Sequence, residues 1–460
     1  MTNRRQFLAG CAGCVMSSVC TAAPATPQLP KTEKVKLRLV FTHIPPDKPT
    51  WPYIGFDYEG RKKELTAKLE QACPFAQFLP ATVGNPAEAK KLLLADDEVD
   101  GYIVYMLGIW TGSARVIGSW GKPTLFVDDL YGGSGEFLTA YSQAKRAGWK
   151  VAPVSTTRFG DLVEAVRAFE TIKKLQASKM LDVVNRDPGE NARAIREMFG
   201  TTVQTVSGEE FNDAYRRADR AEGEKWADKW VKEAEKVVEP SRAEIGNSGA
   251  MYVAMRDLMA KSNAQGIAID CLTLYYAGKL PAYPCLGLFQ FNNDGLVGAC
   301  EADLQSAISM LVMSYMTGRP GYISDPVIDT SKNQIIYAHC VAPSKVFGPN
   351  GAGNPYHIRS HSEDRKGAAV RSLMPIGEMT TTLRFNPISK QVIFHQGKTV
   401  ENIDDDKACR TKVAAEVSDI DKLLSEWDSW GWHRVTFYGD LKKQVDLISA
   451  LTGFTVVKEG

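Results

Sequence analysis

The feature that most constrains this chain is an alternation of short apolar runs with helical patterns between residues 35 and 270. A strand–helix–strand order of this kind is typical of βαβ units, whose strands form a parallel sheet. We expect strands at 35–42, 101–107, 123–127, 151–155, 180–184, 202–206 and 266–270, and helices at 61–73, 86–95, 135–147, 162–175 and 191–199. The heavily charged segment 209–238 is predicted to form one long helix with a solvated face.

The segment after residue 339 has a different texture. Gly, Pro and Ser are frequent from 343 to 400, and short β runs are expected at 380–385 and 391–395. The predicted fold class is therefore α/β, with two N-terminal Rossmann-like parallel-sheet domains and a C-terminal α+β domain that has an antiparallel β-barrel-like part. The 460 residues leave room for α/β domains at 31–158 and 159–285 and a third domain at 286–460.

The composition excludes several classes of protein. The hydrophobic fraction is 44%, the charged fraction is 24% and the net charge is +1, which are ordinary values for a globular protein. A nucleic-acid-binding protein would show a basic stripe or a strong positive balance, so we expect no nucleic-acid partner. No segment after the N-terminus has about 18 uninterrupted apolar residues, and we predict no membrane span in the mature chain.

The N-terminus resembles a targeting segment. Arg4-Arg5-Gln6-Phe7-Leu8 is a twin-arginine pattern, and a weakly apolar run and small residues follow it. We predict a Tat-type signal over residues 1–30 and a mature protein exported to the periplasm; the alternative is a chance Arg-Arg pair. Six cysteines remain after the signal, and their wide spacing favours buried free thiols over a disulfide scaffold: Cys73, Cys271, Cys285, Cys300, Cys340 and Cys409.

A buried helix with two acids in its first turn is the most informative stretch. Apolar residues recur at helical spacing from Leu304 to Tyr315, methionines fill most of the opposite face, and Gly318 is expected to end the helix. Glu301 and Asp303 are two residues apart, so one is expected to serve a site while the other caps the helix or faces elsewhere. Strand periodicity from 335 to 341 then determines the direction of His339.

Four residues form a candidate metal site. Glu301, Asp325, His339 and His433 offer two carboxylates and two imidazoles, a set that suits Mn²⁺, Zn²⁺ or Fe²⁺. Ordinary structural explanations also exist: Glu301 as a helix N-terminal acid, Asp325 as a turn residue before a proline, and His339 as a histidine satisfied within a strand. His357 and His361 lie in a loop-like stretch and are a second metal pair, substrate contacts or solvated residues.

The order of these motifs resembles the L-fucose/L-arabinose isomerase superfamily over roughly residues 265–460. The resemblance rests on Gly298-Ala299-Cys300-Glu301-Ala302-Asp303, the apolar helix, Gly318, Asp325, His339-Cys340 and Gly431-Trp432-His433-Arg434-Val435. It implies that Glu301, Asp325, His339 and His433 hold a divalent metal, with Mn²⁺ as the expected ion. Asp329 is the rival of Asp325, and His339 is the least certain ligand because the fucose branch uses one histidine.

The resemblance also implies an activity and an assembly. Family members interconvert an aldose and a ketose through an enediolate, and Glu301 and Asp325 would exchange the proton as a base/acid pair. Members are trimers or hexamers with sites at subunit junctions, so His43, Trp110 and Arg158 are expected to reach a neighbour's site, with His361 as a further sugar contact. A metal-dependent hydrolase, lyase or epimerase acting on a carbohydrate, and a non-catalytic exported sugar-binding protein, remain the alternatives.

Overall fold

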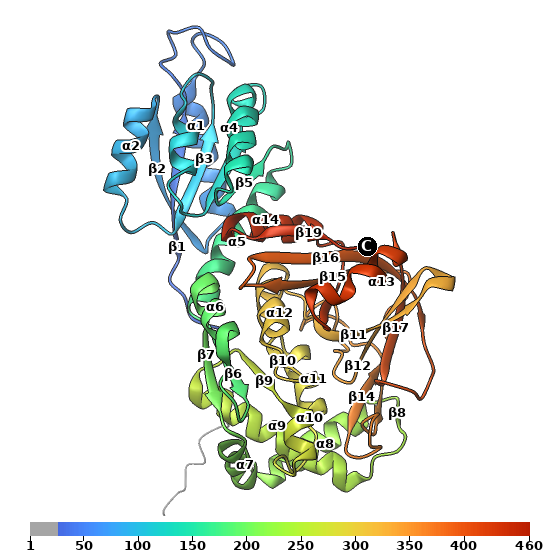
Figure 1. Ribbon diagram of the computed structural model, residues 1–460. Coiled ribbons are helices and arrows are strands. Elements are labelled where there is room, and N and C mark those ends of the chain that lie inside the picture. The colour runs from blue at the N-terminus through green and yellow to red at the C-terminus, as the bar shows by residue number, and fades with distance from the viewer. Residues whose placement is uncertain (1–25) are drawn as a thin grey trace, which may run out of the picture.

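The computed structural model describes residues 26–460, and the twin-arginine motif at Arg4 and Arg5 lies outside the described residues. The chain forms two parallel sheets, a closed antiparallel barrel and one small sheet. The first parallel sheet lies at one end of the molecule (Figure 1). This arrangement confirms the predicted fold class.

The first sheet has the strand order β2-β1-β3-β4-β5 and is parallel throughout. Its strands are β1 (Val35–Thr42), β2 (Ala76–Val83), β3 (Gly101–Met106), β4 (Thr124–Asp128) and β5 (Val151–Val154). One face packs on α1 (Tyr58–Ala72) and α5 (Phe159–Gln176), and the other packs on α2 (Pro86–Ala95), α3 (Ser113–Gly118) and α4 (Ser134–Ala147). Burial on both faces explains why the strands read as nearly continuous apolar runs.

The second sheet has the order β10-β9-β6-β7 and is also parallel. Its strands are β6 (Lys179–Val183), β7 (Thr202–Val206), β9 (Gly266–Ile269) and β10 (Val297–Ala299). The helices of this region are α6 (Gly189–Phe199), α7 (Gly208–Arg217), α8 (Arg220–Glu233), α9 (Arg242–Ser262), α10 (Cys271–Tyr276) and α11 (Cys285–Asn293). The carboxyl ends of these parallel strands share one edge, where ligands bind in open α/β sheets.

The third sheet closes into a six-stranded antiparallel barrel, because β15 pairs with both β18 and β16. Its strands are β11 (Tyr322–Asp329), β12 (Gln334–His339), β15 (Met379–Asn386), β16 (Gln391–Asn402), β17 (Thr411–Val417) and β18 (Arg434–Tyr438), and β19 (Thr455–Lys458) adds to β16. The remaining helices are α13 (Ile420–Glu426) and α14 (Lys442–Thr452), with short 3₁₀ turns at Thr330–Lys332 and Trp427–Trp430. The small sheet joins β8 (Lys236–Val237), β13 (Tyr356–Arg359) and β14 (Ala369–Ser372).

Helix α12 (Leu304–Thr317) lies between the second sheet and the barrel (Figure 1). It is buried on nearly every side and ends at Gly318 in a left-handed conformation with φ +70°, as its sequence predicts. Asp303 caps its start by accepting a hydrogen bond from the Ser306 amide at 3.1 Å. The helix therefore places the Cys300–Asp303 segment at the junction of the two layers.

The prediction of one helix over 209–238 is wrong. The structure has two helices, α7 and α8, and the segment ends in strand β8. Asp219 separates the helices because its carboxylate accepts from the amides of Ala221 and Glu222 and starts a new helix. Within residues 26–460, no helix combines the length and the apolar character that crossing a bilayer requires.

Helices α8 and α9 cross at two glycines, and this contact yields a stability prediction. A Cβ atom at Gly249 would overlap the carbonyl oxygen of Gly223. Gly249→Ala is therefore expected to lower the free energy of unfolding by about 1–3 kcal/mol, as overpacking does. Gly160→Ala in α5 is the control, because nothing lies within 4 Å of its added Cβ, and it should stabilise by about 0.5–1 kcal/mol. Urea denaturation of both variants measures the difference, and equal midpoints would contradict the close crossing.

Candidate metal-binding and active site

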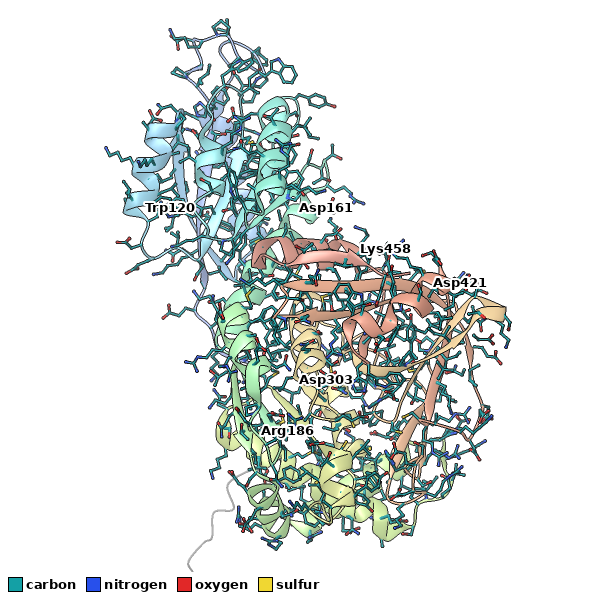
Figure 2. The ribbon with its side chains drawn as sticks, in the orientation of Figure 1. Trp120, Asp161, Arg186, Asp303, Asp421 and Lys458 are labelled. Carbon is teal, nitrogen blue, oxygen red and sulfur yellow. The ribbon has the colours of Figure 1, made fainter. Side chains whose placement is uncertain are left out.

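The site lies where the carboxyl edge of the second sheet meets the barrel. Asp303, labelled in Figure 2, marks this junction. Glu301 follows strand β10 and has a left-handed backbone with φ +58°, as does Ala302 with φ +48°. The Ala302 amide donates to the Ile269 carbonyl at 2.9 Å, which anchors the segment to strand β9. Consecutive non-glycine residues with positive φ are uncommon and point to a functional constraint on this turn.

The barrel supplies the other ligand candidates at adjacent register positions. Asp325 on β11 pairs with Ala338, the residue before His339 on β12. Ser324, the residue before Asp325, pairs with Arg434, the residue after His433. The antiparallel register therefore brings Asp325 beside both histidines, which no spacing along the sequence reveals.

Glu301, Asp325 and His433 form one compact group. Their ligand atoms all lie within 4.8 Å of one another. His433 Nε2 is 3.3 Å from both Glu301 Oε2 and Asp325 Oδ1, yet this buried nitrogen makes no hydrogen bond within the described part of the chain. A buried polar atom without a partner needs an explanation, and a cation between the three side chains supplies one.

Asp303 orients His433. The imidazole donates from Nδ1 to Asp303 Oδ2 at 3.0 Å, which leaves Nε2 directed at the two carboxylates. The same carboxylate accepts from Arg384 Nη2 at 3.3 Å. Burial raises the pKa of Asp303, but the charge of Arg384 and the contact with His433 outweigh burial, so the pKa lies well below its usual range. A carboxylate behind a histidine is the usual support of a metal-bound imidazole.

His339 lies beside this group rather than inside it. Its Nδ1 is 3.2 Å from Asp325 Oδ2, and its ring is perpendicular to that of His433 with centroids 6.2 Å apart. The side chain is almost completely buried, and Nε2 has no hydrogen-bond partner among residues 26–460. The structure thus brings all four predicted ligands to one place.

The protonation behaviour follows from the gathered carboxylates. Burial lowers the pKa of His433, but three neighbouring carboxylates outweigh burial and raise the pKa to about 11. Burial likewise lowers the pKa of His339, and Asp325 raises it to about 8. Burial raises the pKa values of Glu301 and Asp325, but the histidines hold both below the usual range. The cluster therefore favours positive charge at its centre, whether from protons or from a cation.

The structure separates the two rival acids on β11. Asp329 is at the far end of the strand, where it accepts from the amide and hydroxyl of Ser331. It belongs to no metal-binding group in the described chain. Two residues that the site uses were not predicted: Trp432 donates from Nε1 to Asp325 Oδ1 at 2.9 Å, and Cys409 Sγ is 3.5 Å from Asp325 Oδ2. For Trp432, the sequence feature that could have indicated this role was its position next to His433.

Comparison with known proteins adds a likeness to named enzymes. No family model matches the chain. It is similar to proteins named sulfoquinovose isomerase, at 23% identity over 306 residues in Alkalicoccus urumqiensis, which is 64% of this chain and 67% of that protein. The match from Clostridium sp. (strain MSTE9) is 24% identical over 298 residues, 61% of this chain and 64% of that protein. The match from Priestia megaterium is 23% identical over 230 residues, 48% of this chain and 50% of that protein.

The chain resembles sugar isomerases. The matches span about half to two thirds of the length of these curated relatives. The likeness agrees with the expectation of an isomerase-like enzyme that acts on a carbohydrate, and the relatives give no information on the export signal or the metal.

The other predicted sugar contacts are not gathered at the cluster within one chain. His43 and Trp110 follow strands β1 and β3 of the first sheet, which lies at one end of the molecule in Figure 1. His43 stacks on Tyr58 with ring centroids 3.9 Å apart, whereas Trp110 is 74% exposed. Arg158 is exposed and pairs with Asp161 at 3.2 Å.

His361 lies nearer the cluster. Its ring stacks on Tyr283 with centroids 4.3 Å apart, and its buried Nδ1 has no partner among the described residues. It also lies close enough to Cys340, the neighbour of His339, for its charge to affect that thiol. His361 therefore borders the site on the side of the thiols.

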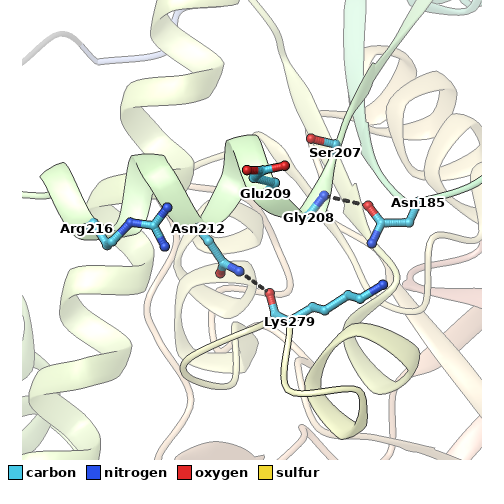
Figure 3. Close-up of a pocket in the computed structure, with 7 residues that line it drawn as sticks. All are labelled: Asn185, Ser207, Gly208, Glu209, Asn212, Arg216 and Lys279. Atoms are coloured by element: carbon cyan, nitrogen blue, oxygen red, sulfur yellow. Dashed lines mark hydrogen bonds between the residues drawn. The ribbon is translucent and has the colours of Figure 1, made fainter.

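A polar pocket of about 380 Å³ lies at the ends of β6 and β7 (Figure 3). Three hydrogen bonds lie at its wall: the Gly208 amide donates to Asn185 Oδ1, the Glu210 amide to Ser207 Oγ, and Asn212 Nδ2 to the Lys279 carbonyl. The pocket contains none of the four ligand candidates, so its size does not make it the catalytic centre.

Proposed function

We propose that this protein is a metal-dependent sugar isomerase that interconverts an aldose and a ketose. The observation that carries the proposal is the convergence of Glu301, Asp325 and His433, with His339 beside them, in a chain similar to sulfoquinovose isomerases. Two carboxylates and two buried imidazole nitrogens without partners fit a divalent cation, and the oxygen-rich part of the set suits Mn²⁺. Glu301, Asp325 and His433 would hold it, with His339 beside them as the fourth candidate ligand.

The two carboxylates perform the proton transfer. When bound, a divalent cation polarises the sugar carbonyl and makes the neighbouring hydroxyl more acidic. Glu301 and Asp325 keep 31% and 20% of their side chains exposed, so both are accessible to a sugar. One takes the proton from the carbon beside the carbonyl; that carboxyl group, or the other after the proton has passed to it, then gives the proton to the neighbouring carbon, through an enediolate. The histidines hold both carboxylates ionised, as a base must be.

Asp303 has a positioning role in this scheme. Asp303→Asn keeps the shape of the side chain and weakens its hydrogen bond to His433 Nδ1. We expect the affinity for Mn²⁺ to fall by about 10–100-fold, the usual effect of removing a carboxylate behind a metal-binding histidine. Isothermal titration with Mn²⁺ measures it. An unchanged affinity in a folded variant would exclude the positioning role.

The substrate class that we propose is an anionic aldose, as the name of the relatives indicates for their own substrate. Arg186 supplies a positive charge at the same sheet edge. It follows β6, its Nε is 4.0 Å from Asp270 Oδ2, and 56% of its side chain is exposed. Asp270 follows β9, and the adjacent Ile269 carbonyl accepts from the Ala302 amide, so Arg186 lies at the same sheet edge as the turn that carries Glu301.

Arg186→Gln tests this assignment of substrate class. We expect KM for sulfoquinovose to rise by about tenfold or more with little change for a neutral aldose, because a charge-assisted hydrogen bond contributes about 1.5–3 kcal/mol. Arg193→Gln, on the following helix, is a charge-matched control. An equal effect of Arg186→Gln on charged and neutral sugars would contradict the role.

The proposed function is tested by metal content and solvent deuterium together. Purified protein should contain about one Mn, Zn or Fe per chain, and a Glu301→Ala/His433→Ala variant should lose it. Incubation with sulfoquinovose and a panel of neutral aldoses in D₂O should convert an aldose to a ketose and introduce deuterium beside the carbonyl. Metal without conversion would favour a hydrolase, lyase or epimerase, and sugar binding without metal would favour a binding protein.

We also propose that the active form is an exported homo-oligomer. His43 and Trp110 follow strands β1 and β3 of the first sheet, which lies at one end of the molecule (Figure 1), and a neighbouring copy would let them approach a site. Light scattering of the purified protein tests the assembly, and a monomer with full activity would exclude it.

A further inference from the structure

Five of the six free cysteines of the described chain surround the candidate metal site, and we call this set the sulfur wall. Its members are Cys271, Cys285, Cys300, Cys340 and Cys409, whereas Cys73 lies in the first domain. All are buried except Cys409, which is partly exposed. The proton transfer proposed above uses none of them.

Two members of the sulfur wall each form a possible metal-binding group with His339. Cys300, Glu301 and His339 form one group with ligand atoms within 4.8 Å of one another, and Asp325, His339 and Cys409 form a second. In the second group, hydrogen bonds already join the three side chains, because Asp325 Oδ2 accepts from both His339 Nδ1 and Cys409 Sγ. The first group leaves His339 Nε2 buried without a partner among residues 26–460.

The neighbouring Cys271 thiol also supports Cys300 as a ligand. Cys300 Sγ is 3.2 Å from Cys271 Sγ, a distance at which the Cys271 thiol can donate to a Cys300 thiolate. A coordinated divalent ion deprotonates a thiol outright.

We propose that Cys300 is a metal ligand and that, with Glu301 and His339, it selects Zn²⁺ or another thiophilic divalent ion for this centre. The inference rests on the proposed function only in that both need a cation beside Glu301. Binding replaces the S–H bond of Cys300 by a sulfur–metal bond and releases one proton to solvent, with no change of oxidation state. The consequence is a softer site than the carboxylate and imidazole set alone would make.

Cobalt is the probe that distinguishes the two ligand sets. Co²⁺ added to reduced, metal-free protein should bind at about one per chain and give a near-ultraviolet thiolate-to-cobalt charge-transfer band. Cys300→Ser should abolish the band and weaken Co²⁺ binding by about tenfold or more, while Mn²⁺ binding changes less. Cys285→Ser is the matched control, because Cys285 is an equally buried member of the sulfur wall that belongs to no ligand group.

A second measurement uses the unaltered protein, in case Cys300→Ser fails to fold. Saturating Zn²⁺ should protect Cys300 from alkylation by N-ethylmaleimide in partly denatured protein, mapped by mass spectrometry, more than it protects Cys285. Cobalt bound without the band, or a Cys271–Cys300 disulfide in the purified protein, would overturn the proposal. Either result alongside normal isomerisation would leave the proposed function standing, whereas failure to bind both Co²⁺ and Mn²⁺ would overturn both.

Discussion

Glu301→Gln is expected to lower the rate of sugar isomerisation by about a thousandfold, because it removes an acid–base carboxylate and a metal ligand without changing the shape of the side chain. Glu301 Oε2 lies 3.3 Å from His433 Nε2, and the amide group of Gln cannot take a proton from the sugar. The fold should persist, because Glu301 caps no helix and 31% of its side chain is exposed. Steady-state kinetics, with circular dichroism as the check on folding, measures both parts.

The matched comparison is on strand β11. Asp325→Asn should reduce activity by a similar factor, whereas Asp329→Asn should leave it near that of the unaltered protein. The two acids lie on one strand and one face, and only Asp325 approaches the histidines. Normal turnover of Glu301→Gln would exclude the acid–base role of Glu301. Equal losses of activity in Asp325→Asn and Asp329→Asn would mean that both substitutions act by disturbing strand β11.

Glu459→Gln is expected to lower the free energy of unfolding by about 3–5 kcal/mol, because it leaves the charge of Arg434 buried without a counter-ion. Both side chains are fully buried, and Arg434 Nη2 and Nε donate to the two oxygens of Glu459 at 2.9 and 3.0 Å. His395 Nδ1 donates to the same carboxylate at 3.0 Å. Thermal and urea unfolding measure the loss.

The same pair makes stability depend on pH. Burial raises the pKa of Glu459, but His395 and Arg434 outweigh burial and lower it to about 2 from an ordinary 4.5. Since the folded state holds the proton less tightly, the stabilisation is complete above about pH 4.5 and is lost as the pH falls toward 2. The difference in stability between the unaltered protein and Glu459→Gln should therefore shrink over that range.

The control for the ion pair is at the surface. Lys442 and Asp446 form an exposed pair one helical turn apart in α14. Asp446→Asn should change the free energy of unfolding by less than about 1 kcal/mol, as exposed pairs do. A loss as large as that of Glu459→Gln, or a difference independent of pH between 5 and 3, would contradict the role assigned to the buried carboxylate.

The parts of the fold that were predicted depend on local pattern. The apolar runs of the first two sheets, the end of α12 at Gly318 and the direction of His339 follow from periodicity and capping. The break at Asp219 was missed because charged residues continue through it, and only the capping hydrogen bonds distinguish a new helix. Closure of the barrel depends on the pairing of β15 with β16 and β18, which no local pattern encodes.

The residues of the site also divide into those that the sequence predicted and those that only the structure identified. The residue types predicted a metal site at Glu301, Asp325, His339 and His433, and the structure gathers them. The choice between Asp325 and Asp329 required the strand register, since the two are about 13 Å apart along one strand. The support of His433 by Asp303 and the contact of Trp432 with Asp325 required tertiary structure.

The candidate ligands come from two layers of the molecule. Asp325, His339 and His433 belong to the barrel, where a closed ring of strands holds them, whereas Glu301 belongs to the turn after the second sheet. An ion bound by ligands from both layers would link the second sheet to the barrel across helix α12, and its removal would break that link. Its binding free energy would then add directly to the cohesion of the two layers, and the melting temperature of the whole chain would rise with the concentration of free ion.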